Sequence, residues 1–198
     1  AFVATNAFAI PKEVLTPDGD VETANAVISS IVSDNKVYAP VGGETVALDQ
    51  VSDPVFASGM MGEGMAIKPA EPGINKVYAP QAGTLSVVAD TGHAYGLTTD
   101  DGMEILVHLG IDTVNLKGAP FTVAVKAGQH VNKGDLLGTF DQAAIKKAGL
   151  DATTIVLITN SKSYARIEPV AADTTVQAGA DLLAVQREDV KVESVEPA

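Results

Sequence analysis

The sequence contains no cysteine among its 198 residues, which excludes disulfide bonds, thiolate zinc sites and a cysteine nucleophile. Basic residues are also few, because 13 Lys and Arg stand against 25 Asp and Glu and give a formal net charge of −12. This charge repels phosphate backbones and anionic lipid, so it disfavours nucleic acid as a partner. A basic protein surface is the more suitable partner.

Long apolar runs are missing as well. No stretch approaches the ~20 apolar residues that a membrane-spanning helix needs, so the sequence predicts no span. The apolar start at residues 1–10 is too short for a span and lacks the basic beginning of a signal peptide. We expect it to be an excised end.

Glycine and proline are plentiful, and their number predicts the fold class. Eighteen Gly and ten Pro in a chain with only 19% charged residues indicate many tight turns between short strands. We therefore expect an all-β protein with short helical turns. The length favours one domain, which we place at residues 37–186, between a linker at 1–36 and an acidic tail at 187–198.

Two segments have helical patterns. Apolar residues recur with helical spacing over residues 21–32, which predicts a short amphipathic helix. A linker helix is favoured there over a membrane-surface helix, because no Lys or Arg supports binding to anionic lipid. A second helix, of one or two turns, is expected over residues 142–148, where Gly149 ends it.

The chain also contains internal repeats. Val37-Tyr-Ala-Pro40 returns as Val77-Tyr-Ala-Pro80, and residues 131–137 resemble residues 176–183. Each copy leads into a short apolar strand. Two copies are too few for a solenoid, so the repeats predict duplicated hairpin units within one fold.

Three histidines are candidates for chemistry. His130 lies in a polar turn and is expected to be solvated. His108 lies in a strand-like run in which Met103, Ile105 and Val107 alternate with Glu104, Leu106 and His108. Apolar neighbours partly desolvate this imidazole and keep a nitrogen neutral, so that it can act as a nucleophile or ligand. Gly110, which lacks a Cβ, leaves room for another chain to approach.

His93 is the natural partner of His108. The two are separated by an apparent turn at Thr99-Asp-Asp-Gly102, and antiparallel pairing about that turn places them on neighbouring strands. Two imidazoles could share a phosphoryl group, with one accepting it and the other donating a hydrogen bond. Zinc is the competing ligand, but two histidines without a third ligand make an incomplete site.

Other catalytic motifs are absent from the sequence. It contains no Gly-x-Ser-x-Gly elbow, no phosphate-binding Gly-x-x-x-x-Gly-Lys-[Ser/Thr] loop and no His-x-His or His-Glu-x-x-His pair. The segment Gly62-Glu-Gly64 lacks the third glycine of a nucleotide loop, and we expect it to serve a turn.

The chain resembles the glucose-type enzyme IIA family of the phosphoenolpyruvate-dependent sugar phosphotransferase system over about residues 36–186. The most specific motif is Gly102-Met-Glu-Ile-Leu-Val-His-Leu-Gly-Ile-Asp-Thr-Val-Asn-Leu-Lys-Gly118. Supporting motifs are Ala39-Pro40 with Gly43, Asp53-Pro-Val-Phe-Ala57, Gly62-Glu-Gly-Met-Ala-Ile-Lys-Pro69 and Thr91-Gly-His-Ala94.

This resemblance implies an antiparallel β-sandwich that acts as a phosphotransferase component. By the same resemblance, His108 receives phosphate from the phosphocarrier HPr and passes it to a cysteine of an enzyme IIB domain. His93 supports the transfer without being phosphorylated, and Thr91 orients His93. Asp53 and Asp112 flank the site and face basic groups of the donor. The implied apolar rim for partner contact comprises Val55, Phe56, Met60, Met61, Leu106 and Val114.

The resemblance also bears on the context of the chain. Residues 1–36 resemble the end of a membrane-embedded sugar permease domain, which implies fused IIB and IIC partners and a cytoplasmic site tethered to the membrane. No cofactor is required. A biotinyl or lipoyl carrier is the alternative, but Lys68 and Lys117 lack the expected hairpin-tip setting. A regulatory role through the same apolar patch stays open.

Overall fold

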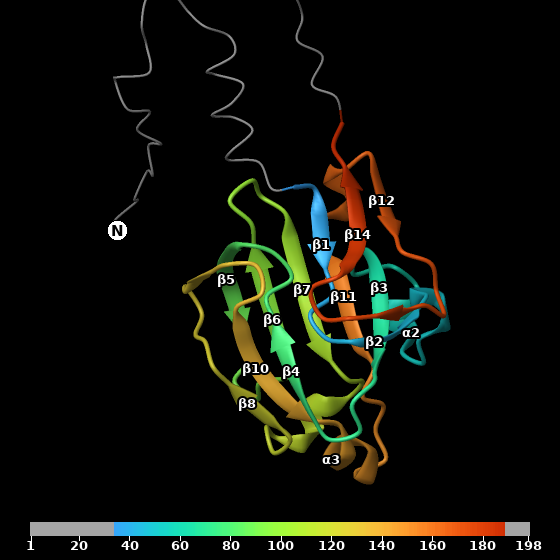
Figure 1. Ribbon diagram of the computed structural model, residues 1–198, viewed down its shortest axis with the longest axis vertical. Coiled ribbons are helices and arrows are strands. Elements are labelled where there is room, and N and C mark those ends of the chain that lie inside the picture. Colours follow the sequence, from blue (N-terminus) through green and yellow to red (C-terminus); the bar gives the residue numbers. More distant parts are fainter. Residues whose placement is uncertain (1–33, 189–198) are drawn as a thin grey trace, which may run out of the picture. The chain divides into compact units, whose positions relative to one another are not determined.

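The computed structural model describes residues 34–188, and within them every strand pairing is antiparallel. The strands form three sheets, and the helices in the connections between successive strands are short (Figure 1). This confirms the predicted all-β class. The helix predicted over residues 21–32 and nearly all of the predicted tail lie outside the described residues, so the proposed division into linker, domain and tail stays a prediction.

The largest sheet has eight strands. In spatial order they are β13 (Thr175–Val176), β2 (Gly43–Val46), β3 (Glu63–Pro69), β11 (Thr154–Ile158), β7 (Glu104–Leu109), β6 (Ala94–Thr98), β5 (Gly83–Val88) and β9 (His130–Val131). A three-stranded sheet contains β1 (Lys36–Tyr38), β14 (Asp181–Gln186) and β12 (Arg166–Pro169). The other contains β4 (Ile74–Tyr78), β10 (Leu136–Asp141) and β8 (Phe121–Val123).

The helical segments are brief. They are η2 (Leu48–Gln50), α2 (Pro54–Ala57), η3 (Thr113–Leu116), α3 (Gln142–Lys147) and η4 (Ser161–Ser163). Helix α3 confirms the helix predicted over residues 142–148, and Gly149 follows it with a φ of +77°. At its beginning the Asp141 carboxylate accepts the Ala144 N–H at 3.1 Å, which caps an otherwise unpaired backbone donor.

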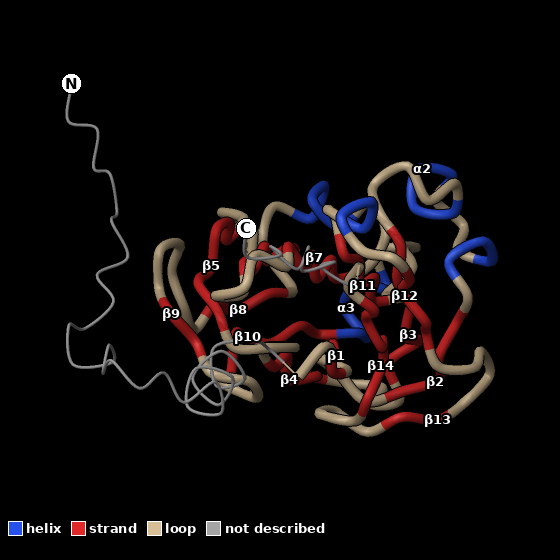
Figure 2. Tube along the Cα trace, turned by 90° about the horizontal axis from the view of Figure 1, so that it is seen from above, coloured by secondary structure: helices blue, strands red, loops and turns tan. Residues whose placement is uncertain are grey.

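Apolar side chains fill both faces of the central strands. Every residue of β11 is buried. On one face, the main core packs the large sheet against the two smaller ones and includes Tyr95, Leu109, Phe140, Val156 and Leu183. On the other face, a smaller cluster contains Val46, Val51, Phe56, Ala66, Ile111, Ile155 and Leu157. Seen from above, α2 and β14 lie on opposite sides of β3 and β11 (Figure 2).

The sequence repeats are a structural duplication. Strand β1 pairs with β14 as β4 pairs with β10, and β2 pairs with β13 as β5 pairs with β9. The two Val-Tyr-Ala-Pro copies bind each other reciprocally. The Tyr38 N–H donates to the Pro80 carbonyl at 3.0 Å, and the Tyr78 N–H donates to the Pro40 carbonyl at 2.9 Å. The duplicated hairpin units predicted from the sequence are therefore confirmed.

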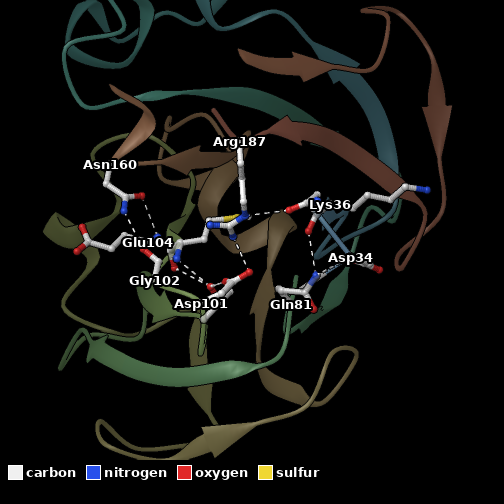
Figure 3. Close-up of polar contacts among 11 residues, drawn as sticks. Asp34, Lys36, Gln81, Asp101, Gly102, Glu104, Asn160 and Arg187 are labelled. Atoms are coloured by element: carbon white, nitrogen blue, oxygen red, sulfur yellow. Dashed lines mark hydrogen bonds and ion pairs between the residues drawn. The ribbon is translucent and has the colours of Figure 1, made fainter. Parts of the chain in front are cut away.

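Polar contacts fix both ends of the described chain beside the β6–β7 turn (Figure 3). The Asp34 carboxylate accepts a hydrogen bond from Gln81 Nε2 at 2.8 Å. Arg187 forms an ion pair with Asp101 at 2.5 Å and donates from Nε to Asn35 at 3.0 Å. His108 lies near the other end of β7, about 14 Å along the strand from Glu104 at ~3.4 Å per residue. Both ends of the described chain therefore lie at the end of β7 that is remote from His108.

Candidate functional site

The β6–β7 hairpin brings His93 and His108 together. Its turn is closed by the Thr99 N–H, which donates to the Met103 carbonyl at 2.9 Å, and Ala94 then lies opposite His108. The two imidazole rings have centroids 5.1 Å apart and planes inclined at 80°. The predicted proximity of the two histidines is confirmed by this geometry.

A bend before β6 makes the contact between the rings. Since Ala94 opposes His108, regular alternation would send the His93 side chain to the opposite face of the sheet. His93 instead lies in a bend that follows Gly92, whose φ is +74°. The Gly92 N–H closes this turn on the Ala89 carbonyl at 2.7 Å. The glycine is needed because such a φ is strained for other residues.

One ring nitrogen of His108 is occupied by the backbone. Its Nδ1 lies 2.8 Å from the Gly110 carbonyl oxygen, which can only accept a hydrogen bond. In the neutral ring Nδ1 therefore carries the proton and Nε2 keeps its lone pair. The sequence points to Gly110 only through its missing Cβ and does not reveal this role of its carbonyl, for which the one available signal is a glycine two residues after the histidine.

The surroundings of His108 favour its neutral form. Burial lowers the pKa of His108, and the neighbouring His93 lowers it further. The Gly110 carbonyl and the carboxylates of Asp53 and Asp112 act in the opposite direction. The net pKa lies below the ordinary 6.5, so a nucleophilic nitrogen is available at neutral pH.

Thr91 and His93 form the second part of the site. Thr91 Oγ1 lies 2.5 Å from His93 Nδ1, so the hydroxyl holds the ring in a fixed orientation. Burial lowers the pKa of His93 as well. The contact between these two side chains agrees with the orienting role that the family resemblance implies for Thr91.

Phe56 was predicted to belong to the exposed apolar rim, and this prediction is wrong. It is only 6% exposed, and its ring packs against that of His108 with centroids 5.1 Å apart. The chain places it there because Asp53 caps α2, and its carboxylate accepts the Val55 N–H at 2.7 Å and the Phe56 N–H at 3.4 Å. Phe56 supports the histidine from within the core, where a partner has little access to it.

The remaining rim residues lie on the surface in different degrees. Leu106 is half-buried and shares the outer face of β7 with His108. The exposed fractions of the others are 49% for Val55, 85% for Met60, 39% for Met61 and 50% for Val114. Methionine is enriched in protein–protein interfaces, so these exposed side chains are candidates for contact with a partner.

Alternative sites are less well supported by the described residues. His130 is exposed, with Nε2 3.6 Å from the Asp100 carboxylate at the surface. Zinc at His93 and His108 would need a third ligand, and no group of three or more potential ligands gathers within residues 34–188. Lys68 lies within β3, and Lys117 directly follows η3, so neither stands at the tip of a hairpin as a biotinyl or lipoyl carrier needs.

Comparison with known families gives one match across most of the described chain. The model of the family described as phosphoenolpyruvate-dependent sugar phosphotransferase system, EIIA 1, matches residues 35–164. The chain is also 41% identical over 150 residues to a glucose-specific EIIA component of Halalkalibacterium halodurans, which covers 76% of this chain and 85% of that protein.

A fused relative and a solved structure extend the comparison. The chain is 44% identical over 168 residues to a beta-glucoside-specific EIIBCA component of Dickeya chrysanthemi. This alignment covers 83% of the chain and 26% of that protein, so the chain spans about a quarter of the fused relative. The glucose permease IIA from Mycoplasma capricolum superposes with a TM-score of 0.66 and 38% identity over 75% of this chain and 93% of that one.

Proposed function

The chain belongs to the EIIA family of the phosphoenolpyruvate-dependent sugar phosphotransferase system, and we propose that it carries phosphate on Nε2 of His108 during sugar import. The observation that supports this proposal most is the 2.8 Å contact between His108 Nδ1 and the Gly110 carbonyl. It leaves Nε2 as the one unprotonated ring nitrogen, beside a second imidazole and on the face of β7 that also carries the half-buried Leu106.

The transfer chemistry follows from this tautomer. The Nε2 lone pair of His108 attacks the phosphorus of a donor phosphohistidine, a new N–P bond forms, and the N–P bond to the donor imidazole breaks. The Nδ1 proton stays in place, so the phosphorylated ring gains positive character. The Gly110 carbonyl and the carboxylates of Asp53 and Asp112 stabilise that character, since all three favour the protonated form of His108.

His93 stabilises the transferred group in this proposal. If the Thr91 hydroxyl donates to His93 Nδ1, then Nε2 of His93 carries the proton and can donate to a phosphoryl oxygen. Because the two ring centroids are only 5.1 Å apart, a phosphate on His108 would lie beside the His93 ring, and we propose that this nitrogen is the donor. One donated hydrogen bond in a partly desolvated site stabilises negative charge that develops during transfer.

We propose HPr as the donor and a cysteine of a IIB domain as the acceptor. The negative charge of the chain and the carboxylates of Asp53 and Asp112 suit a donor with a basic face. The name of the Dickeya chrysanthemi relative joins EIIA to EIIB and EIIC parts, which supports fused IIB and IIC partners and a cytoplasmic site tethered to the membrane. Within residues 34–188 no helix is long and apolar enough to cross a membrane.

No cofactor enters the proposed reaction, because an imidazole lone pair is a sufficient nucleophile for a phosphoryl group.

Phosphoenolpyruvate, enzyme I and HPr should together label the 198-residue chain with one phosphate. Mass spectrometry locates the modified residue, and nitrogen-15 NMR of the imidazoles identifies the modified atom. We expect the phosphate to be on Nε2 of His108. Phosphate on Nδ1, or on any other residue, would overturn the proposal.

Replacing His93 by alanine should separate acceptance from onward transfer. His108 keeps its nucleophilic nitrogen in this variant, so labelling by phospho-HPr is retained. Transfer to a IIB domain should slow on the order of a hundredfold, because one donor to the phosphoryl oxygens is lost. Single-turnover transfer from the labelled variant to purified IIB measures the effect. Sugar phosphorylation at the normal rate would refute the supporting role of His93.

Phosphate acceptance should persist below pH 6.5. The lowered pKa keeps His108 neutral to a more acidic pH, and acceptance fails only as the pH falls through that lowered pKa. Between this pKa and about 6.5 the unfolded chain binds more protons than the folded one, so the free energy of unfolding decreases as the pH falls. A proton NMR titration of the His108 ring measures its pKa. A midpoint above 6.5 would contradict the prediction.

A further inference from the structure

The nucleophilic tautomer of His108 depends on where the Gly110 carbonyl points, and two peptide groups control that direction. The first joins Leu109 to Gly110. Its N–H, on Gly110, donates to the Thr153 carbonyl at 3.0 Å, and its carbonyl, on Leu109, accepts from Thr113 Oγ1 at 2.6 Å. Both polar groups of this peptide are therefore held, which fixes the orientation of its plane.

The second peptide joins Gly110 to Ile111. Its N–H, on Ile111, donates to the Asp151 carbonyl at 2.8 Å, and its carbonyl accepts from His108 Nδ1 at 2.8 Å. The N–H and C=O of a trans peptide point in opposite directions. Binding of the N–H to the 151–153 segment therefore directs the Gly110 carbonyl toward the imidazole.

Thr113 is the side chain that secures this arrangement. It is fully buried, and its methyl group occupies the space beside Gly110, where an added Cβ would lie 2.4 Å from Thr113 Cγ2. Gly110 has a φ of +78°, and glycine has a wide choice of conformations unless its neighbours restrict it. The Thr113 hydroxyl and methyl supply that restriction from one side, and the segment at residues 151–153 supplies it from the other.

We propose that Thr113 is a positioning residue for phosphoryl transfer, because its hydroxyl holds the Leu109–Gly110 peptide so that the Gly110 carbonyl keeps the proton on His108 Nδ1. This inference rests on the proposed function of His108. In it Thr113 acts through the Gly110 carbonyl and does not itself contact the phosphate. Without the hydroxyl, the peptide can rotate about Gly110. The His108 proton then distributes between its two nitrogens, and the fraction of rings with a free Nε2 falls.

The test compares Thr113→Val with Thr113→Ser in the full-length chain. Valine keeps a buried methyl group beside Gly110 and removes the donor, whereas serine keeps the donor. Nitrogen-15 NMR of the His108 ring reports the tautomer directly. We expect Thr113→Val to show both neutral tautomers and to accept phosphate about tenfold more slowly, since the wrong tautomer of a catalytic histidine is unreactive. Thr113→Ser should keep the wild-type tautomer and rate within about twofold.

Thr45→Val is the matched control. Thr45 is also fully buried and donates through Oγ1 to a backbone carbonyl, that of Ala171, at 2.7 Å. Its hydrogen bonds go to the 171–174 segment and to no part of the site. It should lose stability and keep the His108 tautomer and rate. A slowed Thr45→Val variant would assign the effect to lost stability and overturn the proposal.

Two further results would also overturn the proposal for Thr113. One is a wild-type tautomer of His108 in Thr113→Val, and the other is an equal loss of phosphate acceptance in the valine and serine variants. If Thr113→Val does not fold, Thr113→Ser carries the test, because a shifted tautomer in that variant contradicts the role of the hydroxyl. Failure of the proposed function gives a different result, since wild type itself would then carry no phosphate on His108, whatever the state of its tautomer.

Discussion

Replacing His108 by glutamine should remove all histidine-bound phosphate and leave the fold in place. Glutamine has no ring nitrogen that can attack phosphorus, and no other described imidazole has a proton held on Nδ1 by a backbone carbonyl. The side chain is half-buried and its amide can still donate to Gly110, so we expect a loss of stability of only about 1 kcal/mol. Labelling by phospho-HPr measures the first effect and urea unfolding the second.

The control for this variant is His130→Gln, which makes the same chemical change at the surface. His130 is exposed. Within residues 34–188, the charged group that its ring contacts is the Asp100 carboxylate. We expect unchanged labelling and stability. Full labelling of His108→Gln would move the acceptor to another residue, and His93 would then be the first candidate because its imidazole packs against that of His108.

Features that depend on local pattern could be predicted from the sequence. The alternation around His108 is confirmed, since Ile105 and Val107 are buried and Glu104 is exposed. The helix before Gly149 and the duplicated hairpins are also confirmed, and both were predicted from local patterns. Periodicity, capping residues and repeated turn motifs act over a few residues, and the chain itself records them.

Features that depend on the meeting of distant segments could not be predicted in the same way. Phe56 lies four residues from an exposed apolar pair at Met60 and Met61, yet it is buried because α2 turns its ring toward β11 and His108. The bend at Gly92 likewise overrides strand alternation and moves His93 to the face of its partner. The hydrophobic pattern cannot tell a rim residue from one that packs beneath the histidine.

Gly62-Glu-Gly64 is a third case, because the sequence predicts only a turn there. The turn is confirmed at Gly62, whose N–H donates to the Gly59 carbonyl at 3.1 Å, but Gly64 lies within β3, opposite Leu157 of β11. An added Cβ would come within 1.9 Å of the Val156 carbonyl oxygen and 2.9 Å of the Leu157 Cα. Both are backbone atoms of a fully buried central strand, so they cannot move aside as the end of a flexible side chain could. The glycine permits a close approach of two strands.

Gly64→Ala should therefore destabilise the protein by about 3 kcal/mol or more, since relief of the clash requires separating β3 from β11. Gly73→Ala is the matched control: nothing lies within 4 Å of its added Cβ and its φ is not positive. Alanine there restricts the unfolded chain and should stabilise by ~0.4–1 kcal/mol. Urea unfolding of the two variants gives the comparison. Equal stability would show that β3 can shift at little cost. The opposite signs would show that Gly64 is required by the distance between two strands, and this is information that the sequence pattern does not carry.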